Sequence, residues 1–409
     1  MRDSDDFRGS DNLKKPNKNR KFTLAQKLLI ASLLLITVAV AQHLIFDLAG
    51  VEARQDLRLT DTGISISYGF DMHADFYSPG ANHFFYSTRD GIQNISSIGE
   101  QRWQHGFNKI QPKMVGRGGT VAVGEPNGHR IYVFGQNGHM YTAILEHPVM
   151  LYAVNGAGYL SVIARTDTGY DVLLFSPDSQ GSPPFRSSIN DANVIPMSAD
   201  VSNCGTYVAI ALLDINTRMF SRVTFSYVRL VDSRGVLDGL FRAYDFDGEF
   251  VYRVQFTSCG RRALVFTDQR ILGYESGEGP QGPMWSISLY NQLDKLYIGE
   301  NILAYVTGDA FLNEPNAVSP GILRIYNFDG NLTGSYDLGS RATHLSIGFN
   351  TVLAGTGRRF YAIDRQGTLL WEYSAIMDVN NMIFLDNTDT VLLAGGTRAA
   401  VMRRLRGVQ

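Results

Sequence analysis

The chain has 409 residues, of which 44% are hydrophobic and 19% charged, and this composition excludes a disordered or collagen-like protein. Lys and Arg number 37 against 39 Asp and Glu, so the formal net charge is -2 and a nucleic-acid-binding role has no electrostatic support. Two cysteines in the whole chain exclude a disulfide scaffold and a cysteine-rich zinc site.

The amino-terminal segment predicts the membrane topology. Residues 1–27 are polar and carry eight basic against four acidic side chains, and an apolar run, LLIASLLLITVAVAQHLIF, follows at residues 28–46. As a helix the run spans about 28 Å, close to the thickness of a bilayer core. Because the basic flank precedes the run, the positive-inside rule leaves the amino terminus in the cytoplasm and exports the rest.

We therefore divide the chain into four parts. These are a disordered cytoplasmic tail (1–27), a transmembrane helix (28–46), a stalk (47–60) and an exported domain (61–405). A cleavable signal peptide is the rival interpretation, since Ala39-Val40-Ala41 has the small-x-small form of a cleavage site. The 27-residue leader is long for a signal peptide, so the pattern favours an uncleaved anchor in the cell membrane.

From residue 61 onward the sequence predicts an all-β domain. Short runs rich in Val, Ile, Leu, Tyr and Phe alternate with polar residues or are continuously apolar, and turn residues separate them. A polar turn containing glycine recurs every 37 to 54 residues, which brackets the length of one four-stranded propeller blade. The glycines of these turns are Gly99, Gly138, Gly181, Gly235, Gly282, Gly330 and Gly367.

A second signature predicts the number of blades. Eight times an apolar strand reaches a tight turn and a second apolar strand leaves it, as in MVGRGGTVAVG, ADVSNCGTYVAIALL and VQFTSCGRRALVF. The unit that begins with the last of these hairpins lacks a fourth strand. The first hairpin, in contrast, follows a strand without a partner, the orphan strand GISISYGF at residues 63–70. Pairing the orphan with the last blade would close the ring and remove both exposed edges. We predict a β-propeller of eight blades, with seven as the alternative if the third or fifth unit is not a blade.

Two segments resemble known propeller repeats. FYAIDRQGTLLWEY at residues 360–373 is similar to the repeat of quinoprotein-like propellers, and DVSNCGTYVAI at residues 200–210 is similar to the inner hairpin of the WD40-like family. With its basic leader and single apolar span, the chain as a whole resembles the membrane-anchored propeller proteins of unknown function from Gram-positive bacteria. The resemblance implies a fold, and we transfer no binding residue from it.

No catalytic constellation appears in the sequence. The eight histidines are dispersed without the spacing of metal ligands, and a GxSxG elbow is absent. The acidic turn from Asp245 to Glu249 is too short for a twelve-residue calcium loop. We therefore assign no catalytic, metal-binding or cofactor-binding residue and expect no cofactor.

The two cysteines occupy matching places, SNCG and TSCG, in consecutive inner hairpins. Equal positions in neighbouring blades should lie farther apart than the roughly 7 Å that a disulfide allows between α-carbons. We predict that Cys204 and Cys259 are free and partly buried thiols.

What remains for function is the surface. The long excursion GDAFLNEPNAVSPG holds an apolar pair, and we take Phe311, Leu312, Asn313 and Glu314 as a candidate interaction loop. The favoured function is a membrane-anchored extracytoplasmic propeller that binds a protein or a cell-envelope polymer as a scaffold or sensor, with no nucleic-acid partner. The alternative is an extracytoplasmic hydrolase or lyase acting on glycans, with acids from different blades gathered in the channel.

Overall fold

The computed structural model of the protein describes residues 59–404 with several short gaps. Outside the description lie residues 70–73, 179–182, 217–218, 229–230, 233–234, 237–238, 278, 280, 312, 377 and 387–388. The predicted tail, the transmembrane run and the stalk up to residue 58 also lie outside it. Within the described ranges, no helix has both the length and the apolarity that crossing a bilayer requires.

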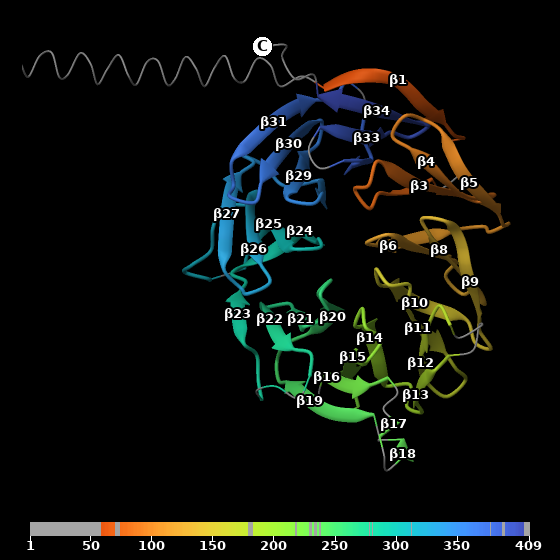
Figure 1. Ribbon diagram of the computed structural model, residues 1–409. Coiled ribbons are helices and arrows are strands. Elements are labelled where there is room, and N and C mark those ends of the chain that lie inside the picture. The colour runs from red at the N-terminus through yellow and green to blue at the C-terminus, as the bar shows by residue number, and fades with distance from the viewer. Residues whose placement is uncertain are drawn as a thin grey trace, which may run out of the picture. The chain divides into compact units, whose positions relative to one another are not determined.

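Eight four-stranded antiparallel sheets form a ring around a central channel (Figure 1). The first four sheets are β2 (Asp75–Tyr77), β3 (His83–Thr88), β4 (Gly91–Ser96) and β5 (Gln101–Gly106); β6 (Lys113–Arg117), β7 (Thr120–Gly124), β8 (Arg130–Gly135) and β9 (Gly138–Ile144); β10 (Val149–Val154), β11 (Leu160–Arg165), β12 (Tyr170–Phe175) and β13 (Phe185–Ile189); and β14 (Val194–Val201), β15 (Tyr207–Asp214), β16 (Phe220–Tyr227) and β19 (Leu240–Phe246). The other four are β20 (Val251–Phe256), β21 (Arg262–Thr267), β22 (Arg270–Glu275) and β23 (Trp285–Ser288); β24 (Asn291–Ile298), β25 (Ile302–Ala310), β26 (Ile322–Asn327) and β27 (Leu332–Asp337); β28 (His344–Ile347), β29 (Thr351–Thr356), β30 (Arg359–Asp364) and β31 (Leu369–Ser374); and β32 (Asn381–Phe384), β33 (Thr390–Ala394), β34 (Arg398–Arg404) and β1 (Leu59–Ser67). The prediction of an all-β propeller with eight blades is confirmed.

In blades 1 to 7 the strands run in chain order from the channel outward, whereas in blade 8 β32, β33 and β34 are followed by β1; we number the blades 1 to 8 as above. We call the first strand of each blade the inner strand and the turn that follows it the inner turn. The eight hairpins read from the sequence all coincide with the pairing of an inner strand and its neighbour. One further hairpin, β17 (Val231–Asp232) with β18 (Gly235–Val236), is inserted between β16 and the outer strand of blade 4.

The first strand of the described chain closes the ring. β1 pairs antiparallel with β34 from Leu59 opposite Arg404 to Ser67 opposite Arg398, so it supplies the outer strand of blade 8. The strand begins two residues before the predicted domain boundary at residue 61. The closure leaves no open edge between the first and last blades, which confirms the predicted role of the orphan strand.

The core lies between the blades. Eight clusters of buried apolar side chains each join one blade to the next around the whole ring. The middle strands are buried on both faces, as in β7, where all five residues are buried, whereas the outer strand β5 alternates exposed and half-buried residues. Continuous apolar runs therefore form the middle strands and alternating runs form the outer ones.

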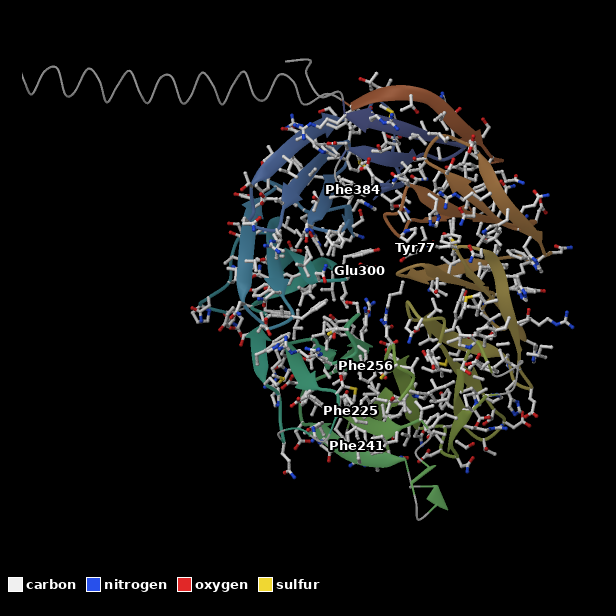
Figure 2. The ribbon with its side chains drawn as sticks, viewed as in Figure 1. Tyr77, Phe225, Phe241, Phe256, Glu300 and Phe384 are labelled. Atoms are coloured by element: carbon white, nitrogen blue, oxygen red, sulfur yellow. The ribbon has the colours of Figure 1, made fainter. Side chains whose placement is uncertain are left out.

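The two ends of the ring are built differently. Because successive antiparallel strands reverse direction, the inner turns and the turns before the outer strands lie at one end, and the remaining connections lie at the other. We call the first the inner-turn end and the second the loop end. Figure 2 shows Tyr77, Glu300 and Phe384 around the channel, whereas Phe225 and Phe241 lie toward the rim of the ring. The inner strands and turns thus place their side chains where a ligand in the channel would meet them.

Candidate ligand pocket in the channel

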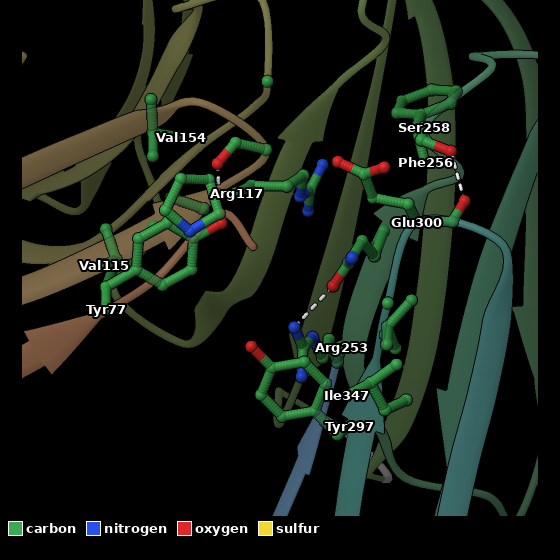
Figure 3. Close-up of a pocket in the computed structure, with 18 of the residues that line it drawn as sticks. Tyr77, Val115, Arg117, Val154, Arg253, Phe256, Ser258, Tyr297, Glu300 and Ile347 are labelled. Atoms are coloured by element: carbon green, nitrogen blue, oxygen red, sulfur yellow. Dashed lines mark hydrogen bonds between the residues drawn. The ribbon is translucent and has the colours of Figure 1, made fainter. Parts of the chain in front are cut away.

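A pocket of about 850 Å³ occupies the channel at the inner-turn end. All eight inner strands contribute to its wall, from Tyr77 of β2 round to Phe384 of β32. Ligand sites of proteins commonly enclose about 300–1,000 Å³, so this volume is that of a small-molecule site. The wall mixes aromatic and aliphatic side chains with a few charged groups (Figure 3).

Arg117, at the end of β6, is one of two guanidinium groups of the wall, and Lys113, at the start of the same strand, is an exposed cation of the wall. The Nη1 of Arg117 donates to both carboxylate oxygens of Asp200, at 2.9 and 3.3 Å, so the guanidinium and the carboxylate form an ion pair. Asp200 is buried on β14 and also accepts a hydrogen bond from the backbone amide of Phe256, at 2.6 Å. The pair links blades 2, 4 and 5, and Arg117 is therefore already compensated by a carboxylate.

Arg253 is the second guanidinium, and a β-bulge directs it to the channel. The pairing of β20 with β21 shifts between Val251 and Arg253, so Tyr252 is the extra residue of the bulge. Arg253 and Gln255 both line the pocket, and Arg253 donates to the side-chain oxygen of Gln255. Burial lowers the pKa of Arg253 from its usual value, and the nearby guanidinium of Arg117 lowers it further. Asp200, Tyr252 and Tyr297 act in the opposite direction and offset part of this effect.

Three tyrosines surround the guanidinium groups. The hydroxyl of Tyr77 donates to the carbonyl of Gly118 at 2.9 Å and so joins blades 1 and 2. Burial raises the pKa of Tyr77 well above its usual value, and it also raises the pKa of Tyr252 and of Tyr297. The three hydroxyl groups therefore stay protonated at neutral pH and remain hydrogen-bond donors.

Glu300, on the inner turn of blade 6, is the one carboxylate among the described residues of the pocket wall. Figure 3 shows its carboxylate directed toward Arg117, and the ring of Tyr297 beside Arg253. The side chain of Ser258 donates to the backbone carbonyl of Glu300, which ties the inner turns of blades 5 and 6 together. The side chain of Asn203 makes the corresponding bond from blade 4 to the carbonyl of Ser258.

The predicted interaction loop lies away from this pocket. Phe311, Asn313 and Glu314 belong to the connection between β25 and β26 at the loop end, and Leu312 lies outside the described residues. Phe311 is half-buried, and Asn313 and Glu314 are exposed. The pocket and the predicted loop therefore occupy different ends of the ring.

Sequence reasoning missed Arg117, Arg253 and Tyr297. These residues come from blades 2, 5 and 6 and converge only in three dimensions. A signal was nevertheless present, because Arg117 directly precedes an inner turn and Glu300 lies within one. Charged residues at the ends of inner strands are the natural candidates for a channel site once the eight hairpins are recognised.

Two other predictions concern single residues. Cys204 and Cys259 are free, but both are exposed rather than partly buried, because each sits in an inner turn beyond the paired strands. In the acidic turn after β19, Asp245 pairs with Arg222 at 2.6 Å and Glu249 with Arg270 at 2.7 Å. The cationic partner of Asp245 thus lies in blade 4, and that of Glu249 lies in blade 5.

Comparisons with known proteins give one matching family model and several similar solved structures. The model of a family of unknown function, DUF5711, matches residues 64–403. The C-terminal WD40 domain of Sif2 is 10% identical with a TM-score of 0.56, over 85% of this chain and 99% of that one. BamB from Moraxella catarrhalis is 11% identical with a TM-score of 0.49, over 86% of this chain and 99% of that one. A comparison with curated proteins gives no match. The WD40-like repeat predicted from the sequence is confirmed as a matter of fold.

Proposed function

We propose that this chain, which belongs to the DUF5711 family of unknown function, is a membrane-anchored propeller that binds a protein or a cell-envelope polymer outside the cytoplasm. Its role would be that of a scaffold or sensor. The amino-terminal basic segment and the apolar run at 28–46 support the anchor, and the closed ring supports the binding role.

The observation that carries the binding role is the inner-turn end of the ring. Side chains tie neighbouring inner turns together, as Tyr77 does with Gly118 and Ser258 with Glu300. Phe349, on the inner turn of blade 7, lines the pocket and leaves 50% of its surface exposed. A rigid rim with an exposed aromatic side chain is suited to recognition, because little ordering is required when a partner binds. The loop from Phe311 to Glu314 offers a second surface at the other end.

The pocket favours binding over glycan hydrolysis. Glycoside hydrolysis commonly uses two carboxylates about 5 to 10 Å apart that both face the substrate. Among the described residues of the wall, Glu300 alone supplies a carboxylate, and Asp200 lies behind Arg117 with its side chain 2% exposed. A hydrolase or lyase would thus have to draw its second acid from elsewhere, and we place this function second.

Site-specific photo-crosslinking tests the binding role. The full chain would carry a photoreactive amino acid at Phe349, at Asn313 or, as a control, at Glu372, which is exposed on the outer strand β31. In native membranes we expect one defined adduct from Phe349 or Asn313 and none from Glu372. Equal adducts at all three positions, or no adduct at the first two, would count against the proposal.

A tag at the carboxyl terminus tests the topology. In intact cells we expect the tag to be labelled by a reagent that does not cross the membrane. A tag that is labelled only after lysis would place the propeller in the cytoplasm and overturn the proposed localisation.

A further inference from the structure

We propose that the channel pocket binds a small monocarboxylate with an apolar body, and that Arg253 holds the carboxylate. This inference concerns the interior of the pocket and does not depend on the partner-binding role proposed above. It rests on the charge balance of the wall, on the hydrogen-bond donors left unused there, and on the apolar surface around them.

The charge of Arg253 is only partly offset, by the carboxylate of Asp200, which makes its ion pair with Arg117 instead. Arg117 is bound by Asp200, and the carboxylate of Glu300 is directed toward Arg117. In the part of the chain that the structure describes, no carboxylate pairs with Arg253, and the neutral side chain of Gln255 is its one hydrogen-bond acceptor. Arg253 is half-buried, and a charge-assisted hydrogen bond to an anion is stronger than one to a neutral acceptor, so an anion from outside would complete the site.

Unused donors converge on the same region. A guanidinium has five N–H groups, and the bond to Gln255 uses one of them, so Arg253, which lines the pocket, keeps further donors for a ligand. Tyr252 and Tyr297 both line the pocket, and neither hydroxyl has a hydrogen-bond partner among the described residues. Both hydroxyls stay protonated at neutral pH, since burial raises their pKa values. Arg253, Tyr252 and Tyr297 can therefore all donate to one anionic group.

The anion that fits this set carries a single charge. The pocket wall carries three cationic side chains, Lys113, Arg117 and Arg253, and two carboxylates, Glu300 and Asp200, lie in or behind it, so one positive charge is left over. A dianion such as phosphate would be repelled by the two carboxylates more strongly than a monoanion. The planar fork of a guanidinium also matches the two oxygens of a carboxylate.

The rest of the wall accepts an apolar group. Val115, Ile347, Phe256 and Phe384 line the pocket together with the aromatic ring of Tyr77. A volume of about 850 Å³ is larger than a bare carboxylate such as acetate would fill. The ligand class is therefore a carboxylate attached to an aliphatic or aromatic body.

Calorimetric titration of the full chain in a non-ionic detergent tests the proposal. The probes are 4-phenylbutyrate, its neutral amide 4-phenylbutyramide, and inorganic phosphate, each at neutral pH. We expect 4-phenylbutyrate to bind at least about ten-fold more tightly than the amide, because the charged hydrogen bonds are lost in the amide. Equal affinity for acid and amide would overturn the proposal, and so would tighter binding of phosphate. This comparison uses the wild-type chain and needs no variant to fold.

Three variants locate the charge that is responsible. Arg253→Gln removes the charge and should abolish the preference for the acid, whereas Arg253→Lys keeps the charge without the fork and should retain only part of it. The matched control is Arg165→Gln on β11, since Arg165 is exposed outside the pocket. A preference that survives in Arg253→Gln, or disappears equally in Arg165→Gln, would refute the role of Arg253.

A last arm identifies the source of the carboxylate. A short peptide that ends in phenylalanine with a free carboxyl terminus is compared with the same peptide as its amide. Competition by the free acid peptide would show that a polypeptide terminus can supply the group, and competition by 4-phenylbutyrate alone would show a free small molecule. If crosslinking finds no partner while the titration succeeds, the proposed function fails and the pocket proposal stands.

Discussion

Mild acid should destabilise the protein through one buried histidine, His83. The side chain lies at the start of β3 in blade 1 with no exposed surface, and its ring meets that of Phe85 edge-on at 5.4 Å. Neither ring nitrogen has a hydrogen-bond partner within the described residues, and the side chain of Asn94 nearby is likewise unpaired. Burial lowers the pKa of His83 to about 4, and the charge of Arg102 acts in the same direction.

The sign and size of the effect follow from the lowered pKa. A histidine whose pKa is lower in the folded chain than in the unfolded chain holds fewer protons when folded, so acid favours unfolding. The contribution of His83 to the free energy of unfolding is complete above the histidine pKa of the unfolded chain, about 6.5. It is lost as the pH falls from there toward 4. At 1.36 kcal/mol for each unit, the full loss is about 3 kcal/mol, of which about 2 kcal/mol is lost between pH 7 and pH 5.

Urea unfolding of the full chain at pH 7 and pH 5 measures this loss. The variant His83→Gln keeps a polar side chain but cannot titrate, so its free energy of unfolding should fall by about 2 kcal/mol less than that of the wild type. His129→Gln is the control, because His129 is exposed. The reasoning would be refuted if His83→Gln and the wild type lost the same free energy of unfolding between the two pH values.

Three further predictions concern the ring and its turns. Trp371→Ala should lower the free energy of unfolding by about 3–5 kcal/mol in urea, because the indole is fully buried between blades 7 and 8. If alanine at an exposed position lowered the free energy of unfolding by as much, burial of the indole could not be the reason. Gly321→Ala should lower the melting temperature more than Gly339→Ala: both residues have positive φ, but a Cβ on Gly321 would meet the carbonyl oxygen of Ser340, whereas Gly339 has open space. Equal melting temperatures would count against the steric argument. Cys204 and Cys259 should both react with iodoacetamide in the folded chain, because both thiols are exposed, and mass spectrometry should find two adducts and no crosslink. A chain that reacts only after denaturation would show that the thiols are buried.

The architecture was predictable because it depends on local patterns that repeat. The inner hairpins of blades 4 and 5 show the pattern most clearly, where Cys204-Gly205 and Cys259-Gly260 follow an apolar strand and precede another. Both glycines have positive φ, which the tight turn requires and which glycine adopts without strain. The closing strand was also predictable, since a blade short of one strand and an orphan strand at the opposite end of the sequence complete each other.

The site was not predictable in the same way. Arg253 reaches the channel because a bulge at Tyr252 shifts the alternation of β20, and no simple period-two pattern reveals such a shift. The ion pair of Arg117 with Asp200 joins blades that are not neighbours, so its two members are separated by a whole blade in the sequence. The length and polarity of the connection between β25 and β26 instead predicted an interaction site from Phe311 to Glu314. That loop lies at the opposite end of the ring from the pocket.

The way the ring closes has a consequence for biosynthesis. Thr62 donates its side-chain hydroxyl to the carbonyl of Val401 at 2.8 Å, and 339 positions separate the two residues along the chain. Strand β1 must therefore wait until the segment around Val401 has been translated before it can pair. A product that stops short of β34 would present two unpaired strand edges, which are prone to aggregation. The fold thus makes translation through β34 a precondition for a closed ring.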